Sequence, residues 1–290
     1  MDELLVKKDF TDIYTQKFPD DYLEEMKRLH YRIPDKTKSL YLSLAEQLYE
    51  KLSRPINILD IGSSYGINSA LMKHDLEMSD LDDFFLQEGS TDLEQTRQFF
   101  EKMPSNEHLK FYQIDISDNA LQFSEDVKLC KKGICVNLET ENLSIEEIPS
   151  FDMIIATGCI GYIGYKAFSN LFELIKKQQT KYSQSETDKP IFAFSVLRIF
   201  DMEKIQQTFD YYGYSLVRAD LELIRQRRFS DSAEKSQTVS LLHTKGIDSE
   251  GFEDDGHFYA HFYIASPKKL ESQLISMSKK MKKRVQEANQ

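Results

Sequence analysis

The chain has 290 residues, of which 40% are hydrophobic and 12% aromatic, which is enough for one large core with an accessory piece. Its formal net charge is −11, and an acidic surface argues against nucleic acid or an anionic membrane as the main partner. We therefore expect no nucleic acid and no membrane as a partner. No run approaches the roughly 18 apolar residues that span a membrane, and the charged residues 1–8 do not resemble a signal peptide.

The three cysteines are Cys130, Cys135 and Cys159. Their number is odd, and no Cys-x-x-Cys pair or nearby histidine gives a zinc spacing. We expect three reduced thiols in a cytoplasmic protein that holds no metal.

Residues 1–54 are predicted to form an N-terminal helical cap. Its second half places leucines on one helix face, because they recur every four residues, at Leu40, Leu44, Leu48 and Leu52. Its first half is rich in charges and aromatic residues, so we expect it to lie over the sheet rather than within it. Those aromatic residues are Tyr14, Phe18, Tyr22, His30 and Tyr31.

Residues 56–68 read Ile-Asn-Ile-Leu-Asp-Ile-Gly-Ser-Ser-Tyr-Gly-Ile-Asn. The apolar first half predicts a buried strand, and the small residues Gly62, Ser63, Ser64 and Gly66 predict a sharp turn close to a ligand. The helix that follows would point its free N–H groups back at the turn. A corner of this kind is typical of a nucleotide site.

The chain then alternates between strand and helix patterns up to residue 266, interrupted by an acidic segment at 75–107 that we expect to be a helical insertion. Further strands are predicted at 109–116, 133–137, 151–156, 190–197, 214–217 and 257–265. The alternation predicts an α/β domain over 55–266, with a Rossmann-like, seven-stranded, mostly parallel sheet. The last two strands have no helix pattern between them, which predicts an antiparallel edge strand. Residues 230–256 read as a long polar connection.

Candidate ligand-binding residues follow four of the predicted strands, at the sheet edge where open α/β sheets bind ligands. Asp115 could accept both hydroxyls of a ribose, Asn137 could face an adenine, and Thr157 faces the reactive end of the ligand. The full set of candidate cofactor positions is Asp60, Gly62, Ser63, Ser64, Gly66, Asn68, Asp115, Ile116, Asn137, Leu138, Thr157 and Gly158.

These residues resemble the motifs of the class I S-adenosylmethionine-dependent methyltransferases over about residues 55–265. The first motif of that family, acidic-x-Gly-x-Gly-x-Gly, stands here as Asp60-x-Gly62-x-Ser64-x-Gly66, with Ser64 in place of the middle glycine. Asp115 and the run Phe151–Gly158 match the motifs after the second and fourth strands. The resemblance implies S-adenosyl-L-methionine as cofactor and methyl transfer to an O or N atom of a small-molecule acceptor. Thr157-Gly-Cys-Ile stands where amide and adenine N-methyltransferases carry Asn/Asp-Pro-Pro-Tyr/Phe.

Three other functions remain open. A dinucleotide site requires Gly-x-Gly-x-x-Gly, of which only Gly62 and Gly66 are present, in a different spacing. An aminopropyltransferase uses a related cofactor on a similar fold, but it requires paired carboxylates after strand four. A non-catalytic protein with the methyltransferase fold would use the acidic insertion and the basic tail as docking surfaces.

Candidates for the acceptor site are aromatic and basic residues expected near the reactive end: Tyr14, Tyr31, Tyr162, Arg198 and Phe200. Tyr31, Tyr162 and His30 are candidates for a catalytic role. The alternative for Tyr14 and Tyr31 is packing among the N-terminal helices, and a lone histidine such as His30 more often lies at the surface.

Three further features have structural explanations that we favour. His257 and His261 share a strand face and could bind a metal, but we favour the alternation of aromatic residues on an ordinary strand as their explanation. The run 225–228 contains three arginines, which we expect on a solvated face. Residues 267–290, with seven basic and two acidic residues, predict a basic amphipathic helix. That helix could dock on the acidic insertion or form a homodimer, but packing on its own domain is favoured.

Overall fold

A computed structural model describes residues 11–87, 92–141, 143, 148–182, 185 and 188–288. Residues 1–10 of the predicted cap, 88–91 of the predicted insertion and 289–290 of the predicted tail lie outside the described residues.

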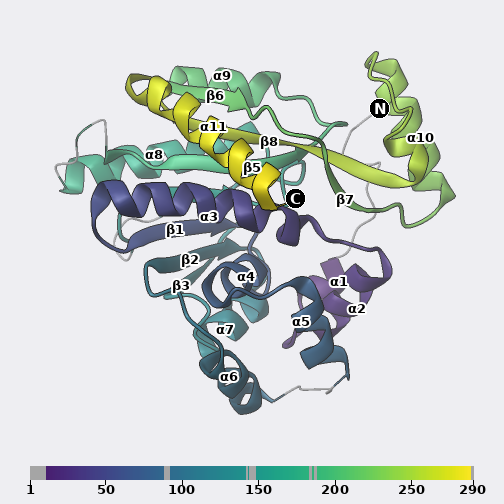
Figure 1. Cartoon of the computed structure of the whole chain (residues 1–290), viewed down its shortest axis with the longest axis horizontal. Helices are drawn as coiled ribbons and strands as arrows, with labels where there is room; N and C mark the ends of the chain where they lie inside the picture. The colour runs from purple at the N-terminus through teal and green to yellow at the C-terminus, as the bar shows by residue number, and fades with distance from the viewer. Residues whose placement is uncertain are drawn as a thin grey trace.

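One sheet, which contains all eight strands of the described chain, organises the molecule (Figure 1). The strands are β1 (Ile56–Ile61), β2 (Leu109–Asp115), β3 (Lys132–Cys135), β4 (Met153–Ala156), β5 (Ile191–Leu197), β6 (Tyr214–Arg218), β7 (Ile224–Arg228) and β8 (His257–Pro267). Their order is β3-β2-β1-β4-β5-β8-β6, and β7 also pairs with β8. The strands β1 to β5 pair in parallel, while β8 runs antiparallel to β5, β6 and β7. The predicted Rossmann-like, mostly parallel sheet is confirmed.

The sheet differs from the prediction in two respects: it contains an additional strand, β7, and its last strand, β8, does not lie at the edge. β8 lies between β5 and β6, and β7 is an eighth strand that pairs with the beginning of β8. The sequence of β7, Ile-Arg-Gln-Arg-Arg, is too charged to show a strand pattern, and a bulge between Arg225 and Arg228 breaks its alternation. The predicted polar connection at 230–256 also contains a helix, α10 (Ser232–Thr244). No apolar stripe marks that helix, because its buried side chains include Glu234 and Thr238.

Helices cover both faces of the sheet. The remaining α-helices are α1 (Thr11–Tyr14), α2 (Asp20–Arg28), α3 (Ile33–Leu52), α4 (Ile67–His74), α5 (Met78–Asp82), α6 (Leu93–Lys102), α7 (Asp118–Asp126), α8 (Tyr165–Tyr182), α9 (Glu203–Tyr211) and α11 (Glu271–Ala288). One apolar core joins α3, α4 and α11 to one face, and a second joins α8 and α9 to the other (Figure 1). The acidic insertion consists of α5, a π-helical turn (Asp83–Gln87) and α6.

The N-terminal helices and the C-terminal helix occupy different positions relative to the sheet. α1 and α2 lie away from the centre of the sheet, whereas α3 lies along it and packs against α11 (Figure 1). α11 buries Leu274 and Met281 against this core, so the tail packs on its own domain. No helix within the described part of the chain is long and apolar enough to cross a membrane.

Candidate functional site

The turn between β1 and α4 has a left-handed backbone at three positions. Gly62 has φ +63°, and a Cβ there would lie 2.7 Å from the Cβ of Cys159, so no larger residue fits without displacement. Gly66 has φ +76° and lies against the side chains of Ser124 and Gln113. Ser64 has φ +50°, a conformation that favours glycine. The glycines at this turn are therefore explained by its left-handed backbone conformation, which Ser64 adopts although it has a side chain.

A cavity of about 290 Å³ opens where β1, β2 and β4 end. It is lined by most of the predicted cofactor positions, namely Gly62, Ser63, Ser64, Asn68, Asp115, Ile116, Asn137, Leu138, Thr157 and Gly158. Asp60 and Gly66 lie outside its lining. The predicted acceptor residues Tyr14, Tyr31 and Tyr162 also line it, whereas Arg198, Phe200 and His30 do not.

Asp60 lies fully buried next to this lining. Both carboxylate oxygens accept hydrogen bonds from Asn68 Nδ2, at 3.0 and 3.2 Å. Burial raises the pKa of the Asp60 carboxyl to about 8, against the opposing effect of the Asn68 amide. Asp60 is thus mainly protonated at neutral pH, and it connects the end of β1 to the first turn of α4 through Asn68.

Asp115 ties the end of β2 to the turn. Its Oδ2 accepts the backbone N–H of Ser64 at 2.8 Å, and its Oδ1 accepts that of Ser117 at 3.0 Å. Burial raises the pKa of Asp115, while these N–H groups lower it. A carboxylate offers about four lone-pair positions, so Asp115 keeps acceptor capacity directed at the cavity.

The cavity wall beyond Asp115 is apolar. Ile116 is 67% exposed although it is large and hydrophobic, and it lines the cavity with Val136, Leu138 and Ile163. Asn137 is held by Glu141, whose Oε1 accepts the Asn137 N–H at 3.1 Å. Such a wall suits a flat aromatic group, and Val136 and Ile163 are members of it that the sequence did not point to.

Two buried hydroxyls in the turn have no hydrogen-bond partner within the described residues. They are Ser63 Oγ and Ser64 Oγ, which belong to residues that line the cavity. A buried hydroxyl without a partner is unfavourable unless a ligand or water satisfies it. Together with the close approach at Gly62, these hydroxyls fit a polar ligand seated on the turn.

The end of β4 is shaped by tyrosines from the N-terminal region. Thr157 Oγ1 forms a 2.8 Å hydrogen bond with the Tyr41 hydroxyl, which comes from α3. Gly158 has φ +73°, and a Cβ there would collide with the Tyr31 hydroxyl and lie 3.0 Å from Gln226 Nε2. Tyr31 is hydrogen-bonded to the Gln226 side chain, so β7 reaches this end of the cavity. Gln226 was not predicted, because the charged sequence of β7 shows no strand pattern.

Residues 13–16, which we call the strap, border the cavity and are hydrogen-bonded to Tyr65 of the turn. The Tyr65 hydroxyl donates to the carbonyl oxygens of Ile13 at 3.2 Å and Gln16 at 2.9 Å. Asn119 Nδ2 donates to the carbonyl of Thr15 at 2.7 Å. Tyr14 and Thr15, which the strap carries, line the cavity.

Replacing Tyr65 with phenylalanine is expected to loosen the strap and leave the fold intact. The change removes the hydroxyl, whose single hydrogen the two carbonyls share, but keeps the ring on Tyr22 and Phe123, so we expect a loss of about 0.5–1.5 kcal/mol. Hydrogen exchange should become faster at the strap and stay unchanged in β1. Exchange at the strap equal to that of the wild type would show that the Tyr65 hydroxyl does not hold it.

The structure places the other candidates away from the cavity. Arg198 forms a 2.7 Å ion pair with Glu253, and its guanidinium lies over the Phe252 ring. Phe200 lies against Gly161, next to Tyr162. His30 is exposed at the end of α2. His257 Nδ1 lies 2.9 Å from Asp255, and the described residues contain no group of three or more side chains suited to hold a metal.

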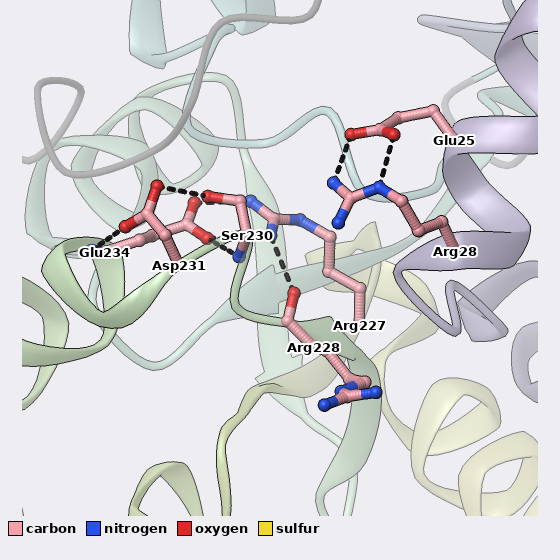
Figure 2. A network of polar contacts seen from close by, with 7 residues as sticks. All are labelled: Glu25, Arg28, Arg227, Arg228, Ser230, Asp231 and Glu234. Atoms are coloured by element: carbon pink, nitrogen blue, oxygen red, sulfur yellow. Dashed lines mark hydrogen bonds and ion pairs between the residues drawn. The ribbon is translucent and has the colours of Figure 1, made fainter.

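The expectation that the arginines of β7 share a solvated face is wrong for Arg227. Its side chain is 3% exposed and forms a two-pronged ion pair with Glu234 of α10, at 2.9 and 2.6 Å. Figure 2 shows this network, in which Ser230 N–H also donates to Glu234 at 2.6 Å. The strand bulge turns Arg227 inward, and a buried guanidinium requires such a partner.

The sequence matches no protein-family model and none of the curated proteins. Solved structures resemble it at low identity. A plantazolicin methyltransferase in complex with SAH is 12% identical, with 91% of this chain and 99% of that chain covered and a TM-score of 0.41. A TehB-like SAM-dependent methyltransferase from Corynebacterium glutamicum is 11% identical (76% and 85% covered, TM-score 0.38). The N-methyltransferase NodS from Bradyrhizobium japonicum is 10% identical (81% and 97% covered, TM-score 0.39).

Proposed function

We propose that the protein is an S-adenosyl-L-methionine-dependent methyltransferase that acts on an O or N atom of a small-molecule acceptor. The observation that carries this proposal is the cavity at the ends of β1, β2 and β4. Along it lie an apolar wall at Ile116, a carboxylate at Asp115, and hydroxyls at Ser63 and Ser64 that have no hydrogen-bond partner among the described residues. This order follows the adenine, the ribose and the polar tail of such a cofactor.

The residues present fit the cofactor in chemistry as well as in order. Asp115 would accept the ribose hydroxyls, and Ile116 and Leu138 would flank the adenine. The hydroxyls of Ser63 and Ser64 would form hydrogen bonds with the methionine part of the cofactor. When bound, the cofactor supplies a methyl group already activated by its sulfonium.

The task that remains for the chain is to align the reactants and exclude water. The strap borders the cavity, and Tyr31 and Tyr14 contribute aromatic side chains to its lining. Burial raises the pKa of the Tyr31 hydroxyl well above its ordinary value, so Tyr31 stays protonated at neutral pH and is suited to hydrogen bonding rather than to removing a proton. His30 lies outside the cavity lining. These residues favour an acceptor whose reacting atom is nucleophilic without a protein base.

The alternatives are less well supported. A polyamine substrate requires several carboxylates, and among the cavity-lining residues of the described chain Asp115 is the single acid. A non-catalytic protein with the methyltransferase fold would bind the cofactor without turnover. Titration calorimetry with S-adenosylmethionine and S-adenosylhomocysteine tests the proposal, and no heat with either ligand at high micromolar concentration would contradict it.

Asp115→Ala is expected to weaken binding of S-adenosylhomocysteine by about 100-fold or more, because hydrogen bonds to a charged group contribute about 1.5–3 kcal/mol each. Asp118→Ala is the matched control: Asp118 is an exposed carboxylate three residues away, at the start of α7, and its replacement should leave the affinity unchanged. Calorimetric dissociation constants for the two variants decide the matter. Equal affinities would mean that Asp115 does not face the ribose.

A further inference from the structure

Three tyrosines from separate parts of the chain converge on one end of the cavity. Tyr14 lies on α1, Tyr31 lies between α2 and α3, and Tyr162 follows β4; all three line the cavity. The Tyr14 hydroxyl interacts electrostatically with those of Tyr31 and Tyr162. The methyl-transfer reaction as outlined above assigns none of them a role in recognising charge.

The positions of these tyrosines are fixed from outside the cavity. The Tyr14 ring lies against that of Tyr22, with 5.3 Å between the ring centroids. Tyr31 is held by Gln226, whose side chain is buried, and by backbone hydrogen bonds that join the neighbouring residues to β7. These bonds run from Arg32 N–H to Gln226 O at 3.1 Å and from Arg228 N–H to Leu29 O at 2.7 Å.

If the proposed cofactor binds with its ribose at Asp115, the spacing of the strands would bring its sulfur to this end. β2, β1 and β4 are neighbours in the sheet, so Asp115 and Gly158 are separated by two strand spacings, or about 10 Å. With the ribose at Asp115, the sulfur, one carbon beyond the sugar, would lie toward Gly62 and Gly158. The Tyr31 hydroxyl lies directly against Gly158.

A sulfonium is a compact cation, and this end of the cavity offers little negative charge to balance it. Asp60 lies outside the lining and is mainly protonated, and Asp115 acts electrostatically on Tyr14 but is hydrogen-bonded to the backbone of Ser64. The faces of aromatic rings are a further source of negative potential that attracts cations.

We propose that Tyr14, Tyr31 and Tyr162 form an aromatic cage that selects the sulfonium cation of the cofactor over the neutral thioether of the spent cofactor. This inference rests on the proposed function and adds a specificity to the same site. Cation–π attraction of the usual strength corresponds to a preference of about 2- to 30-fold. Such a preference would favour release of the product after methyl transfer.

The test compares two probes, S-adenosylmethionine and S-adenosylhomocysteine, by calorimetry on the full chain. We expect the wild type to bind the cationic probe about 2- to 30-fold more tightly. Tyr162→Leu should bring the ratio of the two dissociation constants toward one. The Tyr162 side chain is 47% exposed, so this replacement leaves the core intact. Tyr211→Leu, at an 82% exposed tyrosine on α9, is the control and should keep the wild-type ratio.

Tyr31→Phe separates the ring from its hydroxyl. It keeps the aromatic face and should therefore keep the ratio, whereas Tyr31→Leu should lower it. A wild type that binds both probes with equal affinity, or Leu variants that keep the wild-type ratio, would overturn the cage and leave the proposed function standing. If neither probe binds the wild type, the proposed function fails, and the cage fails with it.

Discussion

Replacing Glu234 with glutamine is expected to lower the free energy of unfolding by about 3–5 kcal/mol, because it leaves the guanidinium of Arg227 buried without a counter-charge. Both side chains are buried, and Glu234 also accepts the N–H of Ser230. The ion pair joins β7 to α10. Urea unfolding at pH 7, followed by circular dichroism, measures the loss.

The chain offers a matched control within the same region (Figure 2). Glu25 and Arg28 form an ion pair of similar geometry, at 2.6 Å, but the Arg28 side chain is half exposed. Glu25→Gln should therefore change the stability by at most about 1 kcal/mol. The combined change Glu234→Leu and Arg227→Met should recover most of the loss, since an apolar pair of similar volume needs no counter-charge. A loss from Glu234→Gln as small as that from Glu25→Gln would show that the buried pair is not needed to hold β7.

The parts of the fold that could be predicted from the sequence are those in which local pattern and tertiary role agree. β1 is apolar because both of its faces are covered, and its turn is rich in small residues because the backbone there is left-handed. The ligand-binding positions after β2 and β4 could also be predicted, because the carboxyl ends of parallel strands meet at one edge of the sheet. The geometry thus brings Asp115, Thr157 and Gly158 to one cavity.

The rest depends on contacts between distant segments, which leave no periodic signal. The strand character of β7 comes from pairing with β8, and its bulge lets Arg227 be buried directly after the buried Gln226. Arg198 was expected at the acceptor because it follows β5. It is instead held by Glu253, a residue more than fifty positions later that lies in a stretch read as a polar connection. For Arg227 and for Arg198, the sequence shows a charged side chain but not whether it contacts a ligand, solvent or another side chain.

The stability of the protein is expected to fall as the pH rises from about 6 to 8, and Asp60 should account for a measurable part of that fall. Burial raises the pKa of the folded-state carboxyl to about 8 from an ordinary value of 3.8. Between these two values the folded state binds more protons than the unfolded state, so the free energy of unfolding decreases with pH. The stabilising contribution is fully present below the unfolded pKa and is lost as the pH passes through 8.

Asp60→Asn isolates this contribution, because the amide cannot ionise and still offers Asn68 a carbonyl oxygen. Urea unfolding of both proteins at pH 6, 7, 8 and 9 should give a steeper decline for the wild type, by up to about 1.4 kcal/mol per pH unit, the value for one proton. Every other titrating group is common to both proteins, so the difference between the curves reports Asp60. Parallel curves would mean that the Asp60 carboxylate is already ionised at pH 6. The positive end of α4 and the amide of Asn68 would then stabilise the charge more than burial opposes it.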